Sequence, residues 1–292
     1  MKIKYKAGYY VFDIINYFIL FLVGFITLYP MWYILIISLS SDYYISRGAV
    51  SIWPRGLTFG AYELVFKHQD IWRSYLNTII YTSVGTLFNM VFTSLCAYPL
   101  SRPDFYGRRF FNFFVVLTMF INGGMIPLYL VIYSLKMLNT IWAIVLPTAI
   151  STYNMIIMRT FFSGIPISLT ESAYLDGAND VQILSKIILP LSKPIIATLT
   201  LFYAVTHWNS FMPAVLYMNS KSKYPVQLIL RDIVVKGEID IQMSFNLIGS
   251  NELSAMNFKY AVIIFTIIPI LCVYPFVQKH FVKGAMIGAI KG

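Results

Sequence analysis

The chain has 292 residues, of which 58% are hydrophobic and only 12% are charged, and its formal net charge is +10. A soluble globular domain carries about 25% charged residues, so this chain has too few charges to cover a water-soluble particle, and its surplus apolar surface must face lipid. The Lys and Arg residues stand mainly at the ends of apolar runs, as headgroup anchors do, which argues against nucleic acid as a partner.

Six apolar runs are long enough to cross a bilayer core, which needs about 20 helical residues. The sequence therefore predicts an all-α membrane protein, with one transmembrane domain over residues 1–292. The predicted spans are residues 14–37, 75–100, 110–135, 141–162, 194–216 and 260–281. Helix breakers interrupt several of them, and we expect neighbouring helices or a cavity to satisfy the freed backbone groups.

The positive-inside rule orients these spans. The short loop after the second span carries Arg102, Arg108 and Arg109, whereas the short loop after the third carries only Lys136. This difference predicts that both termini lie in the cytoplasm. The two long connections, residues 38–74 and 217–259, are expected to fold as small caps outside the bilayer.

With that topology, residues 164–193 lie in the cytoplasm. Pro166 and Thr170 suit the start of a helix, with Thr170 as a candidate N-cap, and Gly177 should interrupt this helix. A second apolar pattern follows and is expected to end at Pro190 and Pro194. The segment is predicted to be an amphipathic helix–turn–helix on which small residues allow close approach of a partner. Three acidic residues, Glu171, Asp176 and Asp180, could pair with basic groups of that partner. An ordinary connecting loop is the alternative.

One motif in this segment resembles a known family. Glu171-Ser172-Ala173, then Asp176-Gly177-Ala178, then Ile187-x-Leu189-Pro190 resembles the EAA loop of ABC-importer permeases. Ser172 replaces an alanine of that pattern, and Leu184 stands where an aromatic residue is common, which puts the shape of the pocket that it fills in doubt. The resemblance implies contact with an ATPase through Glu171, Ser172, Ala173, Asp176, Gly177, Ala178, Leu184, Ile187, Leu189 and Pro190.

Two further stretches carry the resemblance over the whole chain. The ending at residues 281–292 is similar to the second permease subunit of maltose-type carbohydrate importers, and residues 122–129 resemble a subgroup for pectin-derived and alginate-type oligosaccharides. The resemblance implies the type I ABC-importer permease fold in a bacterial cell membrane. It also implies four kinds of partner: a second, different permease chain, two ATPase subunits that hold ATP and Mg, an extracytoplasmic solute-binding protein, and an oligosaccharide.

The sequence has no G-x-x-x-x-G-K-[ST] phosphate loop. Energy must therefore come from a partner or an ion gradient, and we expect no cofactor and no enzymatic activity in this chain. No catalytic set and no metal-ligand spacing stands out either.

Polar and aromatic residues within the spans, near mid-membrane depth or, for Trp208 and Asn209, further out, are candidates for a sugar path, because sugars bind aromatic faces and amide or hydroxyl groups. The candidates are Asn89, Asn122, Tyr129, Tyr153, Asn154, Trp208 and Asn209. Buried asparagines also join helices, and the aromatic residues could be packing or interfacial anchors, so each has a structural alternative.

Other functions make different demands on the sequence. A permease for amino acids or phosphate should carry charged groups near the midplane; the spans have none, which favours neutral polyols. A gradient-driven secondary transporter should show intramembrane acidic residues and inverted repeats, and neither is evident.

Overall fold

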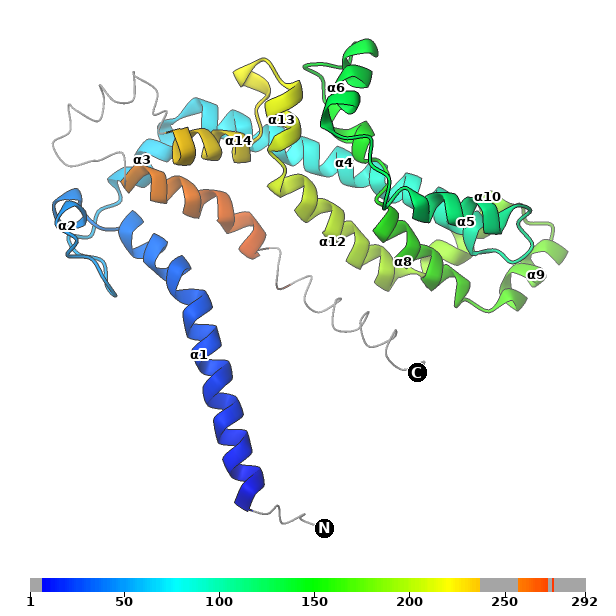
Figure 1. Ribbon diagram of the computed structural model, residues 1–292, viewed down its shortest axis with the longest axis horizontal. Coiled ribbons are helices and arrows are strands. Elements are labelled where there is room, and N and C mark those ends of the chain that lie inside the picture. Colours follow the sequence, from blue (N-terminus) through cyan, green and yellow to red (C-terminus); the bar gives the residue numbers. More distant parts are fainter. Residues whose placement is uncertain (1–6, 237–256, 273–274, 276–292) are drawn as a thin grey trace. The chain divides into compact units, whose positions relative to one another are not determined.

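The computed structural model describes residues 7–236, 257–272 and 275. The chain divides into two compact units, Met1–His68 with Asp232–Ile267, and Gln69–Arg231 with Ile268–Gly292. Figure 1 shows the helices of both, coloured along the sequence. The expected class is confirmed, since the described secondary structure is helical. Predictions for the C-terminal tail lie outside the described residues.

The first unit contains α1 (Ala7–Ser38), α2 (Asp42–Ser46) and α3 (Gly60–Lys67). The apolar side chains of α1 are exposed over most of its length, as a lipid-facing span requires. Its last turn is anchored, because Ile36 and Ile37 pack with Val50, and the hydroxyls of Ser38 and Tyr62 lie 2.7 Å apart. The connection after α1 thus contains two short helices; that it forms a cap outside the bilayer stays a prediction.

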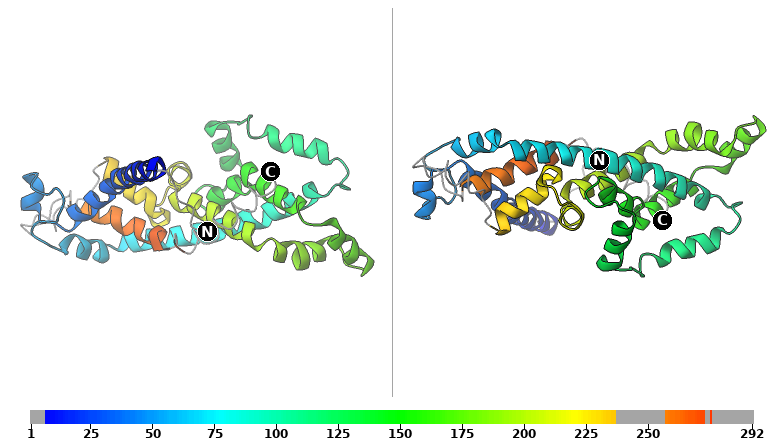
Figure 2. Two further views of the ribbon diagram at one scale, coloured as in Figure 1. Left: turned by 90° about the horizontal axis from the view of Figure 1, so that it is seen from below. Right: turned by 90° about the horizontal axis from the view of Figure 1, so that it is seen from above.

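The second unit is built on α4 (Gln69–Ser101), along which α8 (Thr152–Ser163) and α12 (Lys193–Asn209) pack (Figures 1 and 2). One face of α4 buries small polar side chains against these neighbours, as helix contacts in membranes do. They include Ser74, Thr78, Thr86, Asn89, Thr93 and Ser94. The helix ends at Ser101 because Arg102 precedes Pro103, and a proline disfavours helical geometry in the residue before it.

Predicted spans three to five each consist of more than one helix. Residues 110–135 form α5 (Arg108–Leu117) and α6 (Met125–Ser134), and residues 141–162 form α7 (Trp142–Val145), a 3₁₀ turn at Leu146–Thr148 and α8. Residues 194–216 form α12 and α13 (Met212–Tyr217). The interruptions coincide with residues that disfavour a continuous helix: Gly124 has φ +84°, Pro147 lies in the 3₁₀ turn, and Pro213 lies in the first turn of α13.

Within the described residues, helix length and composition identify fewer complete spans than six. The part of α1 from Val11 to Ser38 and the whole of α4 are each long and apolar enough to cross a membrane. Asp180–Leu191 and Lys193–Asn209 would add a third if this bent pair is one span, and Met125–Ser134 and Asn257–Cys272 are shorter apolar helices. The number six stays a prediction.

The chain after α13 packs back onto the start of α4. The backbone N–H of Val226, the first residue of α14 (Val226–Arg231), donates to Thr78 Oγ1 at 2.8 Å, and the Tyr81 hydroxyl donates to the Lys223 carbonyl at 2.8 Å. These bonds fix one end of α4, while the segment described next is fixed at the other end.

Candidate functional site

Residues 164–193, called the coupling segment below, form the predicted helix–turn–helix. α9 (Ile167–Leu175) is followed by a turn and α10 (Asp180–Ile183), and the helical path continues through a π-helical stretch at Leu184–Ile188 and α11 (Leu189–Leu191). After Ser192 the chain enters α12 with a bend of 87°. The helical form of the segment is therefore confirmed, and its role in docking stays a prediction.

Two details of the prediction are wrong. Thr170 is not the N-cap: Pro166 holds that position, and the Thr170 hydroxyl donates inside the helix to the Ile167 carbonyl at 2.6 Å. Pro190 does not end the second helix, because it lies in the first turn of α11, directly after a π-helical stretch of the kind that tolerates proline. The break falls at Ser192 instead.

The turn between α9 and α10 is held at both ends by hydrogen bonds. The N–H groups of Gly177 and Ala178 donate to the carbonyls of Tyr174 and Ala173, at 3.0 and 2.9 Å, which is a Schellman motif with Gly177 at φ +80°. Asn179 and Gln182 then form a reciprocal capping box that starts α10. The sequence places Gly177 where the left-handed conformation is required.

The coupling segment is anchored to the membrane helices by an apolar cluster. Ala173, Ile183, Leu184 and Ile188 are buried in it together with residues of α4, α8 and α12. Those residues are Ala97, Tyr98, Leu100, Met155, Met158, Phe162 and Leu199. Movement of the coupling segment must therefore move or repack all three helices.

The ten residues that the EAA resemblance identifies fall into buried, half-buried and exposed groups. Ala173 and Leu184 are buried within the chain, so their side chains hold the segment in place. Three are half-buried: Ala178, Ile187 and Leu189. Five are exposed and can meet a partner: Glu171, Ser172, Asp176, Gly177 and Pro190.

Two large apolar residues that the motif does not include are highly exposed. Leu175, at the end of α9, is 90% exposed, and Val181, in the first turn of α10, is 73% exposed. They flank the turn, and large apolar side chains gathered on an exposed projection mark an interaction surface. The signal was available in the sequence, since Leu175 falls outside the apolar stripe that includes Ala173.

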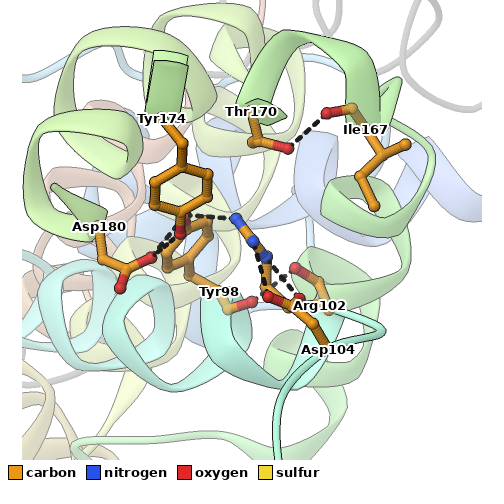
Figure 3. Close-up of polar contacts among 8 residues, drawn as sticks. Tyr98, Arg102, Asp104, Ile167, Thr170, Tyr174 and Asp180 are labelled. Atoms are coloured by element: carbon orange, nitrogen blue, oxygen red, sulfur yellow. Dashed lines mark hydrogen bonds and ion pairs between the residues drawn. The ribbon is translucent and has the colours of Figure 1, made fainter. Parts of the chain in front are cut away.

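A polar network joins the coupling segment to the end of α4 (Figure 3). The Arg102 guanidinium donates to both carboxylate oxygens of Asp104, at 3.0 and 2.9 Å, and to the Tyr98 hydroxyl at 3.2 Å. It also lies 5.2 Å from the ring centroid of Tyr174. The hydroxyls of Tyr174 and Tyr98 both donate to Asp180 Oδ1, so one carboxylate ties α9 and α10 to α4.

The pKa directions agree with this network. The hydrogen bond from Arg102 lowers the pKa of Asp104, and the hydrogen bond to Asp180 raises the pKa of Tyr174 to about 12. Asp180 is thus used inside the chain. Glu171 and Asp176 have no hydrogen bond or ion pair from their side chains to any described residue, which leaves them for a partner.

Asn89 stands apart from the other candidates for the sugar path. It is fully buried on α4; its Oδ1 lies 2.6 Å from His207 Nε2 of α12, and its Nδ2 donates to the Thr148 carbonyl. Thr93 and Tyr203 join the same two helices through hydroxyls 2.7 Å apart. These contacts give Asn89 the helix-joining role that was its structural alternative, and they use His207 as its partner.

The other six path candidates are spread over several elements. Asn122 and Tyr153 are exposed, and the hydroxyls of Thr118 and Thr152 bring the end of α5 and the start of α8 together near them, 3.0 Å apart. Asn154 is buried beside the Ser151 cap.

The aromatic candidates have ring partners. Tyr129 is stacked on Tyr217, and Trp208 meets Tyr75 edge-on. Asn209 is exposed, and its amide donates to the Val205 carbonyl. Among the described residues no hydrogen bond joins any two of the seven candidates.

Comparison with known proteins gives the class of this fold. Residues 89–286 match the family model of binding-protein-dependent transport system inner membrane components. The polygalacturonan/rhamnogalacturonan transport system permease protein YtcP of Bacillus subtilis (strain 168) is 43% identical, over 96% of this chain and 98% of its own length. Protein LplC of the same organism is 41% identical, over 98% and 97%.

Solved structures agree. A chain in the crystal structure of a bacterial ABC transporter that imports the acidic polysaccharide alginate is 36% identical, with a TM-score of 0.92, over 96% of this chain and all of that chain. The chain belongs to the family of binding-protein-dependent transport system inner membrane components. It is a permease of an ABC carbohydrate importer, and the gradient-driven alternative has no support.

Proposed function

We propose that this permease forms, with a second and different permease chain, the membrane path for an oligosaccharide fragment of an acidic polysaccharide. Two relatives support the substrate class, since one is named for polygalacturonan and rhamnogalacturonan and another imports alginate. A solute-binding protein on the outer side delivers the sugar. A more distant solved chain, which shares the fold at 16% identity, comes from an alginate transporter bound to such a protein.

An acidic substrate changes one expectation from the sequence, which favoured neutral polyols because the spans lack central charges. A carboxylate can also be held by neutral donors, since hydrogen bonds to an ionised acceptor are strong. Tyr153 and Asn122 are exposed and can donate. Trp208 Nε1 is buried and has no hydrogen-bond partner among the described residues. These three are the path residues that we propose to meet the sugar.

The coupling segment transmits the energy of ATP hydrolysis to the membrane helices in this proposal. Its exposed turn, between Leu175 and Val181, enters a cleft on one of two ATPase subunits, which hold ATP and Mg. Glu171 and Asp176 meet basic groups there. Because Ala173 and Leu184 are buried with α4, α8 and α12, closure of the ATPases moves these helices and opens the path alternately to either side.

The test separates ATPase contact from folding. Leu175→Ser removes an apolar side chain that is 90% exposed, so it should leave thermal stability unchanged. We expect the purified importer to lose its ATPase subunits while it keeps the second permease. Leu57→Ser, a change at a leucine 62% exposed elsewhere, is the matched control and should keep both.

The substrate class is tested on the intact importer with its binding protein. Trigalacturonate should stimulate ATP hydrolysis and maltotriose should not. Equal stimulation by both sugars would contradict the proposed preference for an acidic substrate. If the importer keeps its ATPases after Leu175→Ser, the exposed turn does not make the proposed ATPase contact.

A further inference from the structure

A basic pocket lies beside the coupling segment and takes no part in the function proposed above. Its volume is about 890 Å³, and it lies between the 102–109 loop, the start of α5 and the end of α8. Three of its lining residues are arginines, Arg108, Arg109 and Arg159, and none is acidic. The nearby carboxylate of Asp104 is already paired with Arg102.

Hydrogen bonds to one asparagine hold the pocket together. Asn112 donates to the Arg108 carbonyl at 2.8 Å and accepts from Arg159 Nη1, so it joins α5 to α8. Arg108 Nε donates to the Leu100 carbonyl at 3.1 Å. A guanidinium has five N–H donors, so Arg108 and Arg159 keep several for a ligand. Arg109 is exposed and makes no side-chain hydrogen bond to any described residue.

The pocket lies where apolar helices end, and the ends of membrane helices lie near the lipid headgroups. α4 and α8 end beside it, at Ser101 and Ser163, and α5 begins there. From this end α5 presents an exposed apolar face that includes Phe110, Phe113 and Phe114, and Tyr106 at the rim is 97% exposed. A tyrosine at the level of the basic groups with apolar rings beyond them is the arrangement of a membrane interface.

We propose that this pocket binds the phosphate of an anionic phospholipid, with its acyl chains along the exposed aromatic face of α5. Positive charge without a compensating carboxylate selects the anion, and basic pockets between membrane helices are suited to lipid headgroups. The neighbouring apolar face selects a lipid over a free phosphate ester. The bound lipid completes the surface beside the coupling segment.

The proposal is tested on the assembled importer in nanodiscs that contain phosphatidylcholine and phosphatidylglycerol, with retained lipid measured by native mass spectrometry. Arg109→Gln and Arg159→Gln should each reduce the preference for phosphatidylglycerol by about fivefold, the effect of one cation at an anionic surface. Arg109→Lys keeps the charge and should keep most of the preference. Lys221→Gln, which removes an exposed charge outside the pocket, should not change it. Excess glycerol phosphate, which has no acyl chains, should not displace the lipid.

Three results would overturn the proposal. The first is an unchanged phosphatidylglycerol preference in both Gln variants. The second is displacement of the lipid by glycerol phosphate, which would assign the pocket to a soluble phosphate. The third is loss of bound trigalacturonate with retention of lipid in the variants, which would assign the arginines to the sugar path.

Discussion

Gly85 of α4 leaves no room for a Cβ atom against His207 of α12. A Cβ atom added there would lie 2.5 Å from His207 Nε2, the nitrogen that faces Asn89. At that separation the ring must move, and its contact with Asn89 is lost with it.

We therefore expect Gly85→Ala to lower the free energy of unfolding by about 1–3 kcal/mol, the usual cost of overpacking. Thermal unfolding in detergent measures this. Gly24→Ala is the control, because a Cβ at Gly24 of α1 has no atom within 4 Å, and alanine suits a helix better than glycine. Equal effects of the two changes would contradict the close approach.

The structure separates two asparagines for which the sequence allowed the same two roles, joining helices or binding sugar. Asn89 and Asn122 have the same chemistry and similar predicted depth, yet Asn89 is fully buried between helices and Asn122 is exposed. Asn89 lies on the face of α4 that meets α12, whereas Asn122 lies in the break between α5 and α6. A single sequence does not contain that information, since polar residues in a span satisfy either role.

At the scale of the element, the turn of the coupling segment depends on one backbone conformation. Gly177 has φ +80°, and a Cβ there would meet no atom within 4 Å. The cost of a substitution is thus conformational alone, about 1–2 kcal/mol for an L-residue in the left-handed region. Asparagine adopts this region more readily than alanine.

We expect Gly177→Ala to speed amide hydrogen exchange in α9 and α10, and Gly177→Asn to do so less. Gly123→Ala provides the control, because it also adds a Cβ in open space but without a left-handed φ. Protection factors that fall equally in the Gly123 and Gly177 variants would show that the Schellman motif does not hold the turn.

Element boundaries were predictable where local signals decide them. Gly177 and Pro103 mark the ends of α9 and α4 through conformations that these residues and their neighbours can adopt. Thr170 and Pro190 were misjudged because each has two outcomes: a threonine can cap a helix or bond within it, and a proline can end a helix or open its next turn. Tertiary packing, here of Ala173 and Ile188 in one cluster, decides between them.

At the scale of the whole molecule, the low charge was sufficient for the membrane class, and apolar runs of about 20 residues were sufficient for the helical fold. The EAA motif was sufficient for the family. Hydropathy alone did not show where an apolar run such as residues 110–135 is broken, although the helix breakers in the sequence indicated that breaks were possible. The network of Arg102, Tyr174 and Asp180 was also missed, because it joins residues distant in sequence.

The predicted topology has a direct test in whole cells. In a chain whose Cys96 and Cys272 are replaced by serine, single cysteines at Lys136 and Ser168, both exposed, should differ in labelling by a membrane-impermeant maleimide. Lys136→Cys should react in intact cells, and Ser168→Cys only after permeabilisation, because the positive-inside rule places them on opposite sides. The reverse pattern would invert the orientation.

The bend at Ser192 joins Asp180–Leu191 of the coupling segment to α12 as the two arms of an angled lever. Ser192 is fully buried, and its hydroxyl has no hydrogen-bond partner among the described residues. The arms meet at 87°, so a sideways push on one arm becomes a tilt of the other. The contacts of Tyr203 with Thr93 and of His207 with Asn89 lie along the second arm. A single tilt of α12 would therefore change both contacts at once.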